Sequence, residues 1–510
     1  MNSQVSGMSI EELQGAIETL AAKTAANDDN SAPTIQAAFE LTELGNAKRF
    51  VAKYKDEIVF VPDQQQWFYW DERLWKPDVD GNALRRFEGV IDELRDEQVP
   101  IAEAMKAAAS EDEQRELGRQ LGIHQSWCRQ SQRVAVMRNS LTLAAVQQGM
   151  SVPLVEFDKK GQFFGCANGI IDLRDGTLIT GDKRYLMTKA SPVEYRPDAQ
   201  CPEWDKFLLR IMDGDAQTVS FLQRLIGQAM FGTQGKDKLT ILWGSGANGK
   251  STFVDTLHDV FGQYATVTDP RMLMDTGRAN KEYYLADLKS ARLVLMSETK
   301  RGDMIAESIV KMLVDGGKIT ARFPAGRVFT FQPVFTPILS TNHRPRVGSD
   351  PAIWRRVLLI PFTHTIPEAE RNPKFRSEVL KAEHEGILRW AVEGAMAFLR
   401  DGLAPTGKVV DATEEYKRSQ DKIGQFFSEE CTLDASERTQ LKVLLDRFNE
   451  WSEDMGFQRL GRTSFKEELL TKGFDIRVST GHVDWVYGIA NRKPVSEFPH
   501  IVPAVAKLVK

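Results

Sequence analysis

The sequence predicts an α/β protein whose central domain is a parallel sheet with a phosphate-binding loop, and three observations support this fold class. Short apolar runs, of the kind found in buried parallel strands, occur at 239–243, 292–296, 334–339 and 357–361. Segments with helical periodicity alternate with these runs, notably at 252–261, 304–314 and 375–400. The first run leads directly into a glycine-rich loop that opens a helix. Alternating strands and helices favour a sheet covered by helices.

The composition is that of a globular protein and excludes several classes. A chain of 510 residues is too long for one ordinary core. Its net charge of −5 gives no global attraction to DNA, so any contact with nucleic acid must come from local basic patches. No stretch approaches the ~20 continuous apolar residues of a membrane helix. The chain has no secretory signal and its four cysteines form no CxxC motif, so we expect a cytoplasmic protein without a zinc module, disulfides or membrane contact.

Changes in composition and hydrophobic periodicity along the chain divide it into five segments. Residues 9–23 have the pattern of a short amphipathic helix, two β-type runs at 58–61 and 67–70 predict a hairpin, and 84–149 predict a helical bundle. The expected segments are an N-terminal helix and linker (1–35), a mixed but mostly helical domain (36–204), the P-loop ATPase domain (205–400), a linker (401–412) and a small C-terminal domain (413–510).

The phosphate-binding motif spans residues 244–251 and matches GxxxxGK[ST] at every required position. Its glycines allow backbone N–H groups to surround phosphate oxygens at the N-terminus of the following helix. Lys250 would reach the β- and γ-phosphates of ATP, and Ser251 would ligate Mg²⁺. An ordinary glycine-rich turn is the alternative. The candidate ATP-binding residues are Gly244, Ser245, Gly246, Ala247, Asn248, Gly249, Lys250, Ser251 and Thr252.

Three polar side chains beyond this loop are candidates for catalysis. Glu298 follows the run at 292–296, where a carboxylate can orient the attacking water and hold Mg²⁺ indirectly; a helix-start acid after Ser297 is the alternative. Asn342 ends the segment 337–342, which runs from a strand into a loop, and could bind the γ-phosphate or the water, unless it is a plain turn residue. Arg355 or Arg356 could stabilise transition-state charge, the alternative being a surface ion pair.

The order and spacing of these motifs resemble superfamily 3 helicases, in particular the phage and plasmid primase–helicase family that includes poxvirus-type enzymes. The resemblance implies an AAA+-like homo-oligomeric ring, a hexamer, that threads one DNA strand and hydrolyses ATP between subunits. It favours Arg355 as the arginine finger, because Arg355 lies seven residues before Phe362. It also implies that a hairpin between the acid and Asn342 contacts DNA, here through Lys318, Arg322 and Arg327, although a solvated turn would have the same composition.

The C-terminal region resembles a winged-helix module, with amphipathic helices at 442–451 and 464–470 and a strand at 482–488. Such a module could bind duplex DNA at an origin, or a protein, because its acids and bases roughly balance.

The function predicted from these features is an ATP-dependent helicase that moves on single-stranded DNA in phage or plasmid replication. A replication initiator or loader that hydrolyses ATP without processive unwinding is the alternative. A small-molecule phosphotransferase is disfavoured, since its P-loop would usually lie near the N-terminus. The first 150 residues contain no paired-carboxylate or zinc motif of a primase, so we expect a separate primase partner.

Overall fold

The computed structural model describes residues 39–232, 238–275, 281–322, 328–348, 350–479 and 482–492. The predicted helix at 9–23 and Arg327 lie outside these ranges. The chain forms two compact units, one of residues 1–159 and 182–188, and one of residues 160–181 and 189–510. The expected boundary at residue 204 differs from this division, because 160–181 and 189–204 pack with the P-loop unit. Within the described ranges, no helix is long and apolar enough to cross a membrane.

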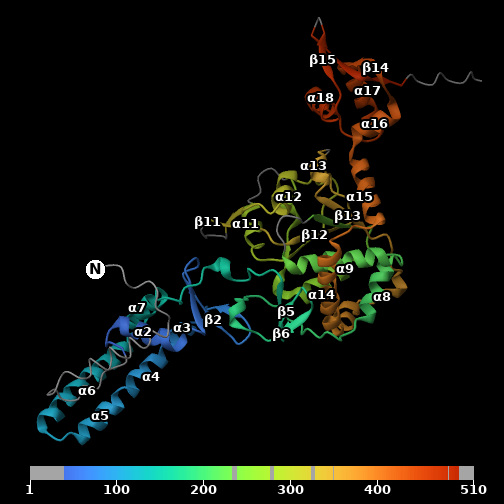
Figure 1. Ribbon diagram of the computed structural model, residues 1–510. Coiled ribbons are helices and arrows are strands. Elements are labelled where there is room, and N and C mark those ends of the chain that lie inside the picture. Colours follow the sequence, from blue (N-terminus) through green and yellow to red (C-terminus); the bar gives the residue numbers. More distant parts are fainter. Residues whose placement is uncertain are drawn as a thin grey trace, which may run out of the picture. The chain divides into compact units, whose positions relative to one another are not determined.

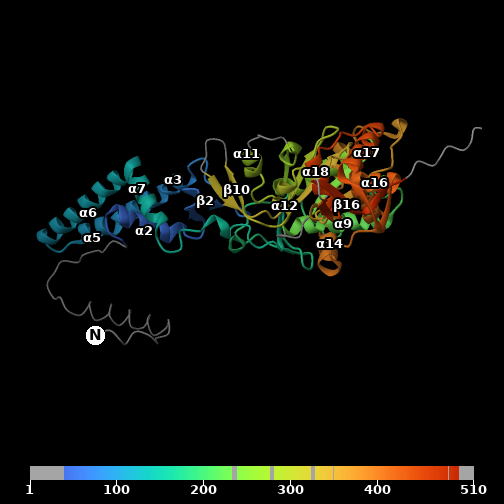
Figure 2. The same cartoon turned by 90° about the horizontal axis from the view of Figure 1, so that it is seen from above.

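The first unit contains the predicted helical bundle, with a small core around Phe50, Phe87 and Leu94. Helices α5 and α6 run side by side in both ribbon views (Figures 1 and 2). The Ser110 hydroxyl caps the first turn of α6, accepting a hydrogen bond from the Glu113 amide. The helices are α2 Glu43–Tyr54, α3 Asn82–Arg86, α4 Glu88–Asp96, α5 Gln98–Ala107, α6 Glu111–Ser131 and α7 Val134–Ala145, with helical turns η1 Leu154–Glu156 and η2 Lys183–Tyr185.

The predicted hairpin is confirmed and gains a third strand. Strands β1 Ile58–Val61, β2 Gln66–Trp70 and β3 Trp75–Pro77 form an antiparallel sheet in that order. Phe68 and Trp75 are buried in a second core of this unit together with Phe157. Aromatic side chains account for much of the buried surface here, which explains why so short a sheet is stable.

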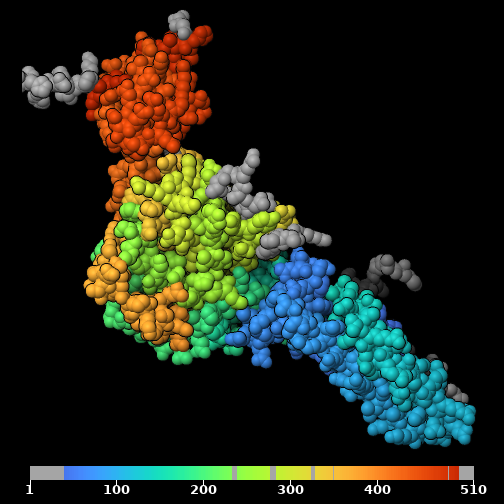
Figure 3. All heavy atoms as spheres, turned by 180° about the vertical axis from the view of Figure 1, so that it is seen from behind, coloured from blue at the N-terminus to red at the C-terminus, as the bar shows by residue number. Residues whose placement is uncertain are grey.

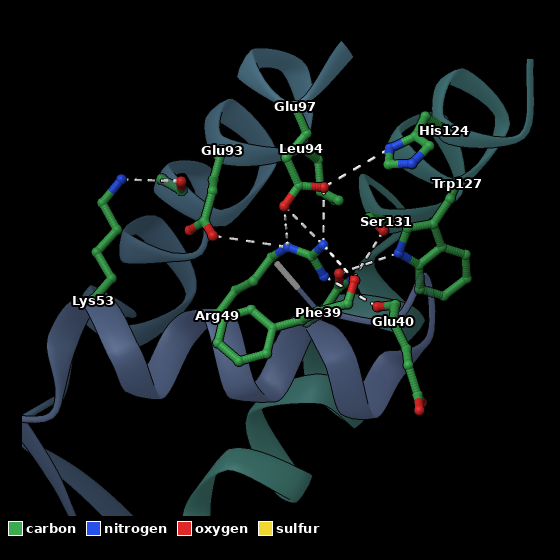
Figure 4. Close-up of polar contacts among 12 residues, drawn as sticks. Phe39, Glu40, Arg49, Lys53, Glu93, Leu94, Glu97, His124, Trp127 and Ser131 are labelled. Carbon is green, nitrogen blue, oxygen red and sulfur yellow. Dashed lines mark hydrogen bonds and ion pairs between the residues drawn. The ribbon is translucent and has the colours of Figure 1, made fainter. Parts of the chain in front are cut away.

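A buried ion pair organises the helices of the first unit (Figure 4). Arg49 on α2 is fully buried, and its guanidinium donates to both oxygens of Glu97, which lies between α4 and α5. Its remaining N–H groups donate to the backbone carbonyls of Phe39, at 2.8 Å, and Glu40, at 3.1 Å. His124 on α6 lies 3.8 Å from Glu97. The buried Arg49 guanidinium therefore connects helix α2, the residues before it (39–40) and the junction of α4 and α5.

The second unit is built on a five-stranded parallel sheet, as the apolar runs predict. Its strands, in spatial order, are β13 Val357–Pro361, β7 Leu239–Trp243, β12 Thr336–Thr341, β9 Leu293–Ser297 and β8 Ala265–Thr268. Strands β7 and β13 coincide with their predicted runs, whereas β12 begins two residues later than expected and β8 was not predicted. All neighbouring strands are parallel, so their carboxyl ends share one edge of the sheet.

Helices and two small antiparallel sheets surround this parallel sheet (Figure 1). Arg292, at the start of β9, is buried and donates to the Phe163 carbonyl at 2.8 Å, which fixes strand β4 to the sheet. The small sheets are β4 Phe163–Cys166, β5 Gly169–Asp172 and β6 Thr177–Ile179, and the hairpin β10 Ile319–Arg322 and β11 Val328–Phe331. The helices are α8 Pro202–Ile211, α9 Ala216–Phe231, α10 Lys250–Phe261, α11 Lys281–Ala286, α12 Glu307–Val314, α13 Pro351–Trp354 and α14 His384–Asp401, with the shorter elements η3 Gly262–Tyr264, η4 Pro270–Met272, η5 Glu368–Glu370 and η6 Phe375–Leu380.

The predicted linker 401–412 is shorter in the structure, because helix α15 Gly407–Gln420 begins inside it. Val409 and Tyr416 are fully buried, and Tyr416 belongs to the core of the parallel sheet. The proline and glycine that suggested a linker instead precede and start a helix. After α15 comes the C-terminal module (Figure 3), with elements α16 Lys422–Glu430, β14 Cys431–Gln440, α17 Leu441–Asp454, α18 Arg462–Thr471, β15 Ile476–Ser479 and β16 Val483–Asn491. All four cysteines are free and buried, so the predicted lack of disulfides is confirmed.

We expect Arg49→Met to lower the free energy of unfolding of the first unit by about 3 kcal/mol, because it leaves the Glu97 carboxylate, whose side chain is only 14% exposed, without its partner. Chemical denaturation followed by tryptophan fluorescence measures this loss. The double variant Arg49→Met/Glu97→Leu should recover most of it, since both charges are then gone. Equal losses in the single and double variants would contradict an ion pair as the cause.

Candidate nucleotide-binding site

The predicted phosphate-binding loop lies between β7 and α10, and its glycines allow neighbouring atoms to come close to its backbone. Gly249 has a φ of +80° at the N-cap of α10, and a Cβ there would come within 2.6 Å of Ile211. A Cβ on Gly244 would come within 2.3 Å of the Phe362 carbonyl oxygen. No side chain caps the first turn of α10. Its N–H groups therefore face the loop, where an anion can accept hydrogen bonds from them.

Lys250 is held by oxygen atoms from two loops. Its Nζ donates to the Gly244 carbonyl at 2.9 Å, to Asn248 Oδ1 at 2.8 Å and to Asn342 Oδ1 at 3.0 Å. The side chain is only 5% exposed. Burial lowers the pKa of Lys250 to about 8, and the nearby Glu298 carboxylate opposes that shift. The structure thus places beside the loop a buried amine that is still charged at neutral pH but has a pKa well below that of an exposed lysine.

A cavity of about 570 Å³ brings the predicted site residues together. Residues 246–252, Glu298 and Asn342 line one end of it. Gly244 and Ser245 belong to the same loop but are not among the lining residues. The volume lies within the range of small-molecule sites, about 300–1,000 Å³. Three elements that are distant in sequence therefore meet at the carboxyl edge of the sheet, where parallel α/β sheets bind ligands.

The other end of the cavity was not foreseen from the motifs. Its walls come from α8 and from the segment after β13, and include the aromatic rings of Phe207 and Phe375, whose centroids are 5.6 Å apart, together with Ile366. Charged side chains surround these apolar groups: Glu203, Lys206, Arg210, Glu370 and Arg371. The amphipathic pattern of 202–211 was the available signal, but it predicts a helix rather than a wall of this cavity.

Glu298 adopts a left-handed backbone conformation, with a φ of +70°, directly after β9. Its amide donates to the Ser340 carbonyl at 3.0 Å, which places it beside the neighbouring strand β12. The hydroxyls of Thr299 and Thr341 lie 2.7 Å apart and both contact the His343 carbonyl. A non-glycine residue in this conformation is strained, and such strain persists where surrounding contacts impose it. These hydrogen bonds fix the loop that carries Glu298.

Asn248 has a positioning role that the motif alone did not indicate. Its Nδ2 donates to the Phe362 carbonyl at 3.1 Å, while its Oδ1 accepts the bond from Lys250. Asn248 is 3% exposed. The side chain therefore ties the loop and Lys250 to the end of β13.

Arg355 and Arg356 differ clearly in the structure. Arg356 is paired with Asp315 at 2.6 and 2.8 Å and donates to the Ala352 carbonyl. Its guanidinium therefore forms its hydrogen bonds within its own chain. Arg355 is exposed and is not among the residues that line the cavity. It precedes β13, whereas the P-loop follows the parallel strand β7, so the two lie at opposite edges of the sheet. Arg355 is therefore not part of the site of its own chain.

The residues predicted to contact DNA are only partly described. Lys318 is exposed just before β10. Arg322 ends β10 and donates to the Tyr283 hydroxyl of α11 at 3.1 Å, with its guanidinium over the Tyr283 ring. None of these contacts involves the cavity.

Three family models match separate stretches of the chain. A model described as D5 N terminal like matches residues 47–213, a family of unknown function matches 242–356, and a model described as poxvirus D5 protein-like matches 418–475. The P-loop and Glu298 lie within the second stretch.

Curated relatives come from large DNA viruses. A protein of Acanthamoeba polyphaga mimivirus, named as a helicase, is 27% identical over 299 residues, covering 54% of this chain and 31% of that protein. A protein of African swine fever virus (strain Badajoz 1971 Vero-adapted), named as a primase, is 22% identical over 331 residues, covering 58% of this chain and 33% of that protein. The chain thus spans about a third of the length of these relatives.

A solved structure, the apo structure of the NrS-1 C-terminal region, is similar with a TM-score of 0.46 and 11% identity, and covers 88% of this chain and 100% of that chain. The matches at both ends of the chain are to D5-type regions, and the named relatives are helicases or primases. The chain is therefore similar to D5-type proteins at both ends and to viral proteins named as helicases or primases, which fits the resemblance to superfamily 3 primase–helicases that its motifs indicate.

Proposed function

We propose that the chain is a subunit of a ring-forming, ATP-dependent DNA helicase that acts in phage or plasmid replication. The observation that carries this proposal is the single cavity in which residues 246–252, Glu298 and Asn342 converge. The names of the viral relatives support a replication protein of the primase–helicase type.

ATP with Mg²⁺ is the ligand that this cavity suits best. The uncapped N-terminus of α10 offers amides to the phosphates, and Lys250 would exchange its oxygen partners for phosphate oxygens. The apolar end, with Phe207, Ile366 and Phe375, suits a nucleoside base. Ser251 would ligate Mg²⁺ directly and Glu298 through water, and the ion would neutralise charge on the phosphates.

The chemistry that the residues would perform is hydrolysis of the γ-phosphate. Glu298 would orient a water molecule and accept its proton as the water oxygen bonds to phosphorus and the bond to the β-phosphate oxygen breaks. β9 is two strands from β7, roughly 10 Å at ~4.8 Å per strand. This leaves room for the γ-phosphate and the water between Lys250 and Glu298. Asn342 directly follows β12, the strand between β7 and β9, and its amide would hydrogen-bond to the γ-phosphate or to the water.

A homo-oligomeric ring would complete the site. Arg355 is exposed at the edge of the sheet opposite the P-loop, so in a head-to-tail ring it would reach the nucleotide of a neighbouring subunit. The strand order, with β12 inserted between β7 and β9, supports an AAA+-like domain. A hexamer threading single-stranded DNA past Lys318 and Arg322, with Arg327 as a further candidate from the sequence, fits this arrangement.

The C-terminal module follows the order helix, strand, two helices and two strands, which supports the winged-helix interpretation. A winged-helix module could take origin duplex DNA or a protein, and a separate primase would supply primers. Strand displacement on forked DNA distinguishes this helicase from the alternative, an initiator or loader that hydrolyses ATP without processive unwinding.

Lys250→Ala should reduce ATP hydrolysis by about a hundredfold or more, because the lost ammonium no longer offsets phosphate charge. Phosphate release measured on the purified chain tests this. Ser245→Ala is the matched control, since Ser245 is exposed in the same loop outside the lining residues and should retain turnover. Full hydrolysis by Lys250→Ala would remove the basis of the proposed function.

Arg355→Ala should keep nucleotide binding and reduce turnover by about a thousandfold, the usual effect of losing an arginine finger. Arg356→Ala is the control and should affect stability more than turnover. Mixing Arg355→Ala with Lys250→Ala chains in equal amounts should restore activity, because about a quarter of head-to-tail interfaces then combine both intact residues. If the mixture stays as inactive as its components, the site is not shared.

Nucleotide affinity should fall as pH rises above about 8, the pKa of Lys250. Below that pH the amine is already charged and binds phosphate fully, whereas above it a proton must be taken up, so affinity falls up to about tenfold per pH unit. Titration with a fluorescent ATP analogue between pH 7 and 9 measures the slope. Lys250→Ala should bind weakly at every pH, and an equal slope in that variant would assign the dependence to another group.

A further inference from the structure

The C-terminal module has a sheet face on which aromatic and arginine side chains alternate. In β16, Val486 is fully buried in the core of the module, so its neighbours Trp485 and Tyr487 point to the opposite face of the sheet. Both are half-buried. β16 is the central strand, paired with β14 on one side and β15 on the other. The two rings therefore lie in the middle of this face.

Two exposed arginines from the flanking strands cover these rings. The Arg438 guanidinium of β14 lies 4.7 Å from the centre of the Trp485 ring, and that of Arg477 of β15 lies 4.9 Å from the centre of the Tyr487 ring. The register explains both contacts, since Arg438 is opposite Tyr487 and Arg477 is opposite Trp485, which makes each stacking partner a diagonal neighbour. We define these four residues as the aromatic–arginine face.

The charges of this face are available to a ligand. Among the residues that the structure describes, the contact of the Arg438 guanidinium is with the Trp485 ring, and Arg438 forms no ion pair. Arg477 is paired with Asp475 at 2.6 Å, but both side chains are more than half exposed, so the pair is worth little and can be exchanged. Asp484, the acid next to Trp485 in the chain, is buried and paired with Arg462 and Lys466. Its charge is thus already neutralised.

We infer that the aromatic–arginine face binds single-stranded DNA, independently of the nucleotide site. Bases stack on aromatic rings and on guanidinium planes without regard to sequence, while the arginines attract the phosphates. Trp485 and Tyr487 are two positions apart on a strand, about 7 Å, which lets two successive unpaired bases stack on separate rings. The face would give the DNA of the proposed helicase a contact outside the ring domain, so this inference rests on DNA being the partner.

The chemistry of the face favours single strands over two other occupants. In a duplex the bases are already stacked on each other, and flat rings on a sheet can reach only the backbone. A protein interface would need a larger apolar centre, whereas here a guanidinium covers each ring. Charged groups stacked on aromatic rings match a ligand that carries both flat bases and phosphates.

Photo-crosslinking of the full chain to a short oligonucleotide containing 5-iododeoxyuridine tests the inference directly. Irradiation joins the modified base to a ring stacked on it, and mass spectrometry identifies the peptide. We expect crosslinks at Trp485 or Tyr487. Arg438→Ala and Arg477→Ala should reduce their yield about fivefold or more, a loss equivalent to one weak stacking contact. These exposed residues lie outside the module core, so both variants should keep the wild-type melting temperature.

The control is Arg459→Ala, which removes an exposed arginine of the same module that is paired with Glu453. Its crosslinks should equal those of the wild type. Crosslinks confined to other parts of the chain, or equal yields in the Arg438, Arg477 and Arg459 variants, would overturn the inference. Competition by duplex DNA as effective as by single strands, or protection of Trp485 in the chain without DNA, would also overturn it, in favour of a duplex or a second protein. Basal ATP hydrolysis, measured without DNA, reports separately on the proposed function.

Discussion

The buried ammonium of Lys250 is the constraint on which the candidate site depends. Removing a charged amine from water costs free energy unless oxygen atoms replace the lost hydration. Gly244, Asn248 and Asn342 supply those oxygens, and they come from loops that follow two adjacent strands. One cation thus links the loop after β7 to the loop after β12. A phosphate group would offer it a full negative charge instead of three neutral oxygens, so part of the binding energy arises from relieving the cost of burial.

The direction of the strands decides which residues can act together. Because β7, β9 and β12 are parallel, the P-loop, Glu298 and Asn342 all lie at their carboxyl ends. Arg355 precedes β13 and lies at the other edge. No side-chain rotation can bring it across the length of a five-residue strand. Arg355 can therefore act at a γ-phosphate only in the site of another chain, and this polarity explains why a ring suits the proposed function.

Local sequence pattern was enough to predict the strand and the loop at the centre of the parallel sheet. It did not predict edge strand β8 or the far wall of the cavity. The run 239–243 coincides with β7 because a buried parallel strand is apolar at nearly every position, Thr240 being the exception here, and the motif 244–251 encodes its own turn. Strand β8 was missed because only Ala265 is fully buried in it. Phe207 and Phe375 share a cavity wall although 168 positions separate them, and that proximity depends on the tertiary fold. Thr406 and Gly407 fit a linker or a helix start equally well, and the burial of Tyr416 decides between them.

Helix α15 joins the loop beyond Asn342 to the edge of the sheet. The Thr413 hydroxyl accepts a hydrogen bond from the Leu359 amide on edge strand β13, and the Tyr416 hydroxyl donates to the Pro345 carbonyl. Arg344, in the same loop, stacks on Trp243, the last residue before the P-loop, with 3.8 Å from the guanidinium to the ring centre. Because Thr413 and Tyr416 lie on the same helix, α15 connects the loop that carries Asn342 to edge strand β13. The same helix leads into the C-terminal module, so that module is covalently continuous with the element that contacts this loop.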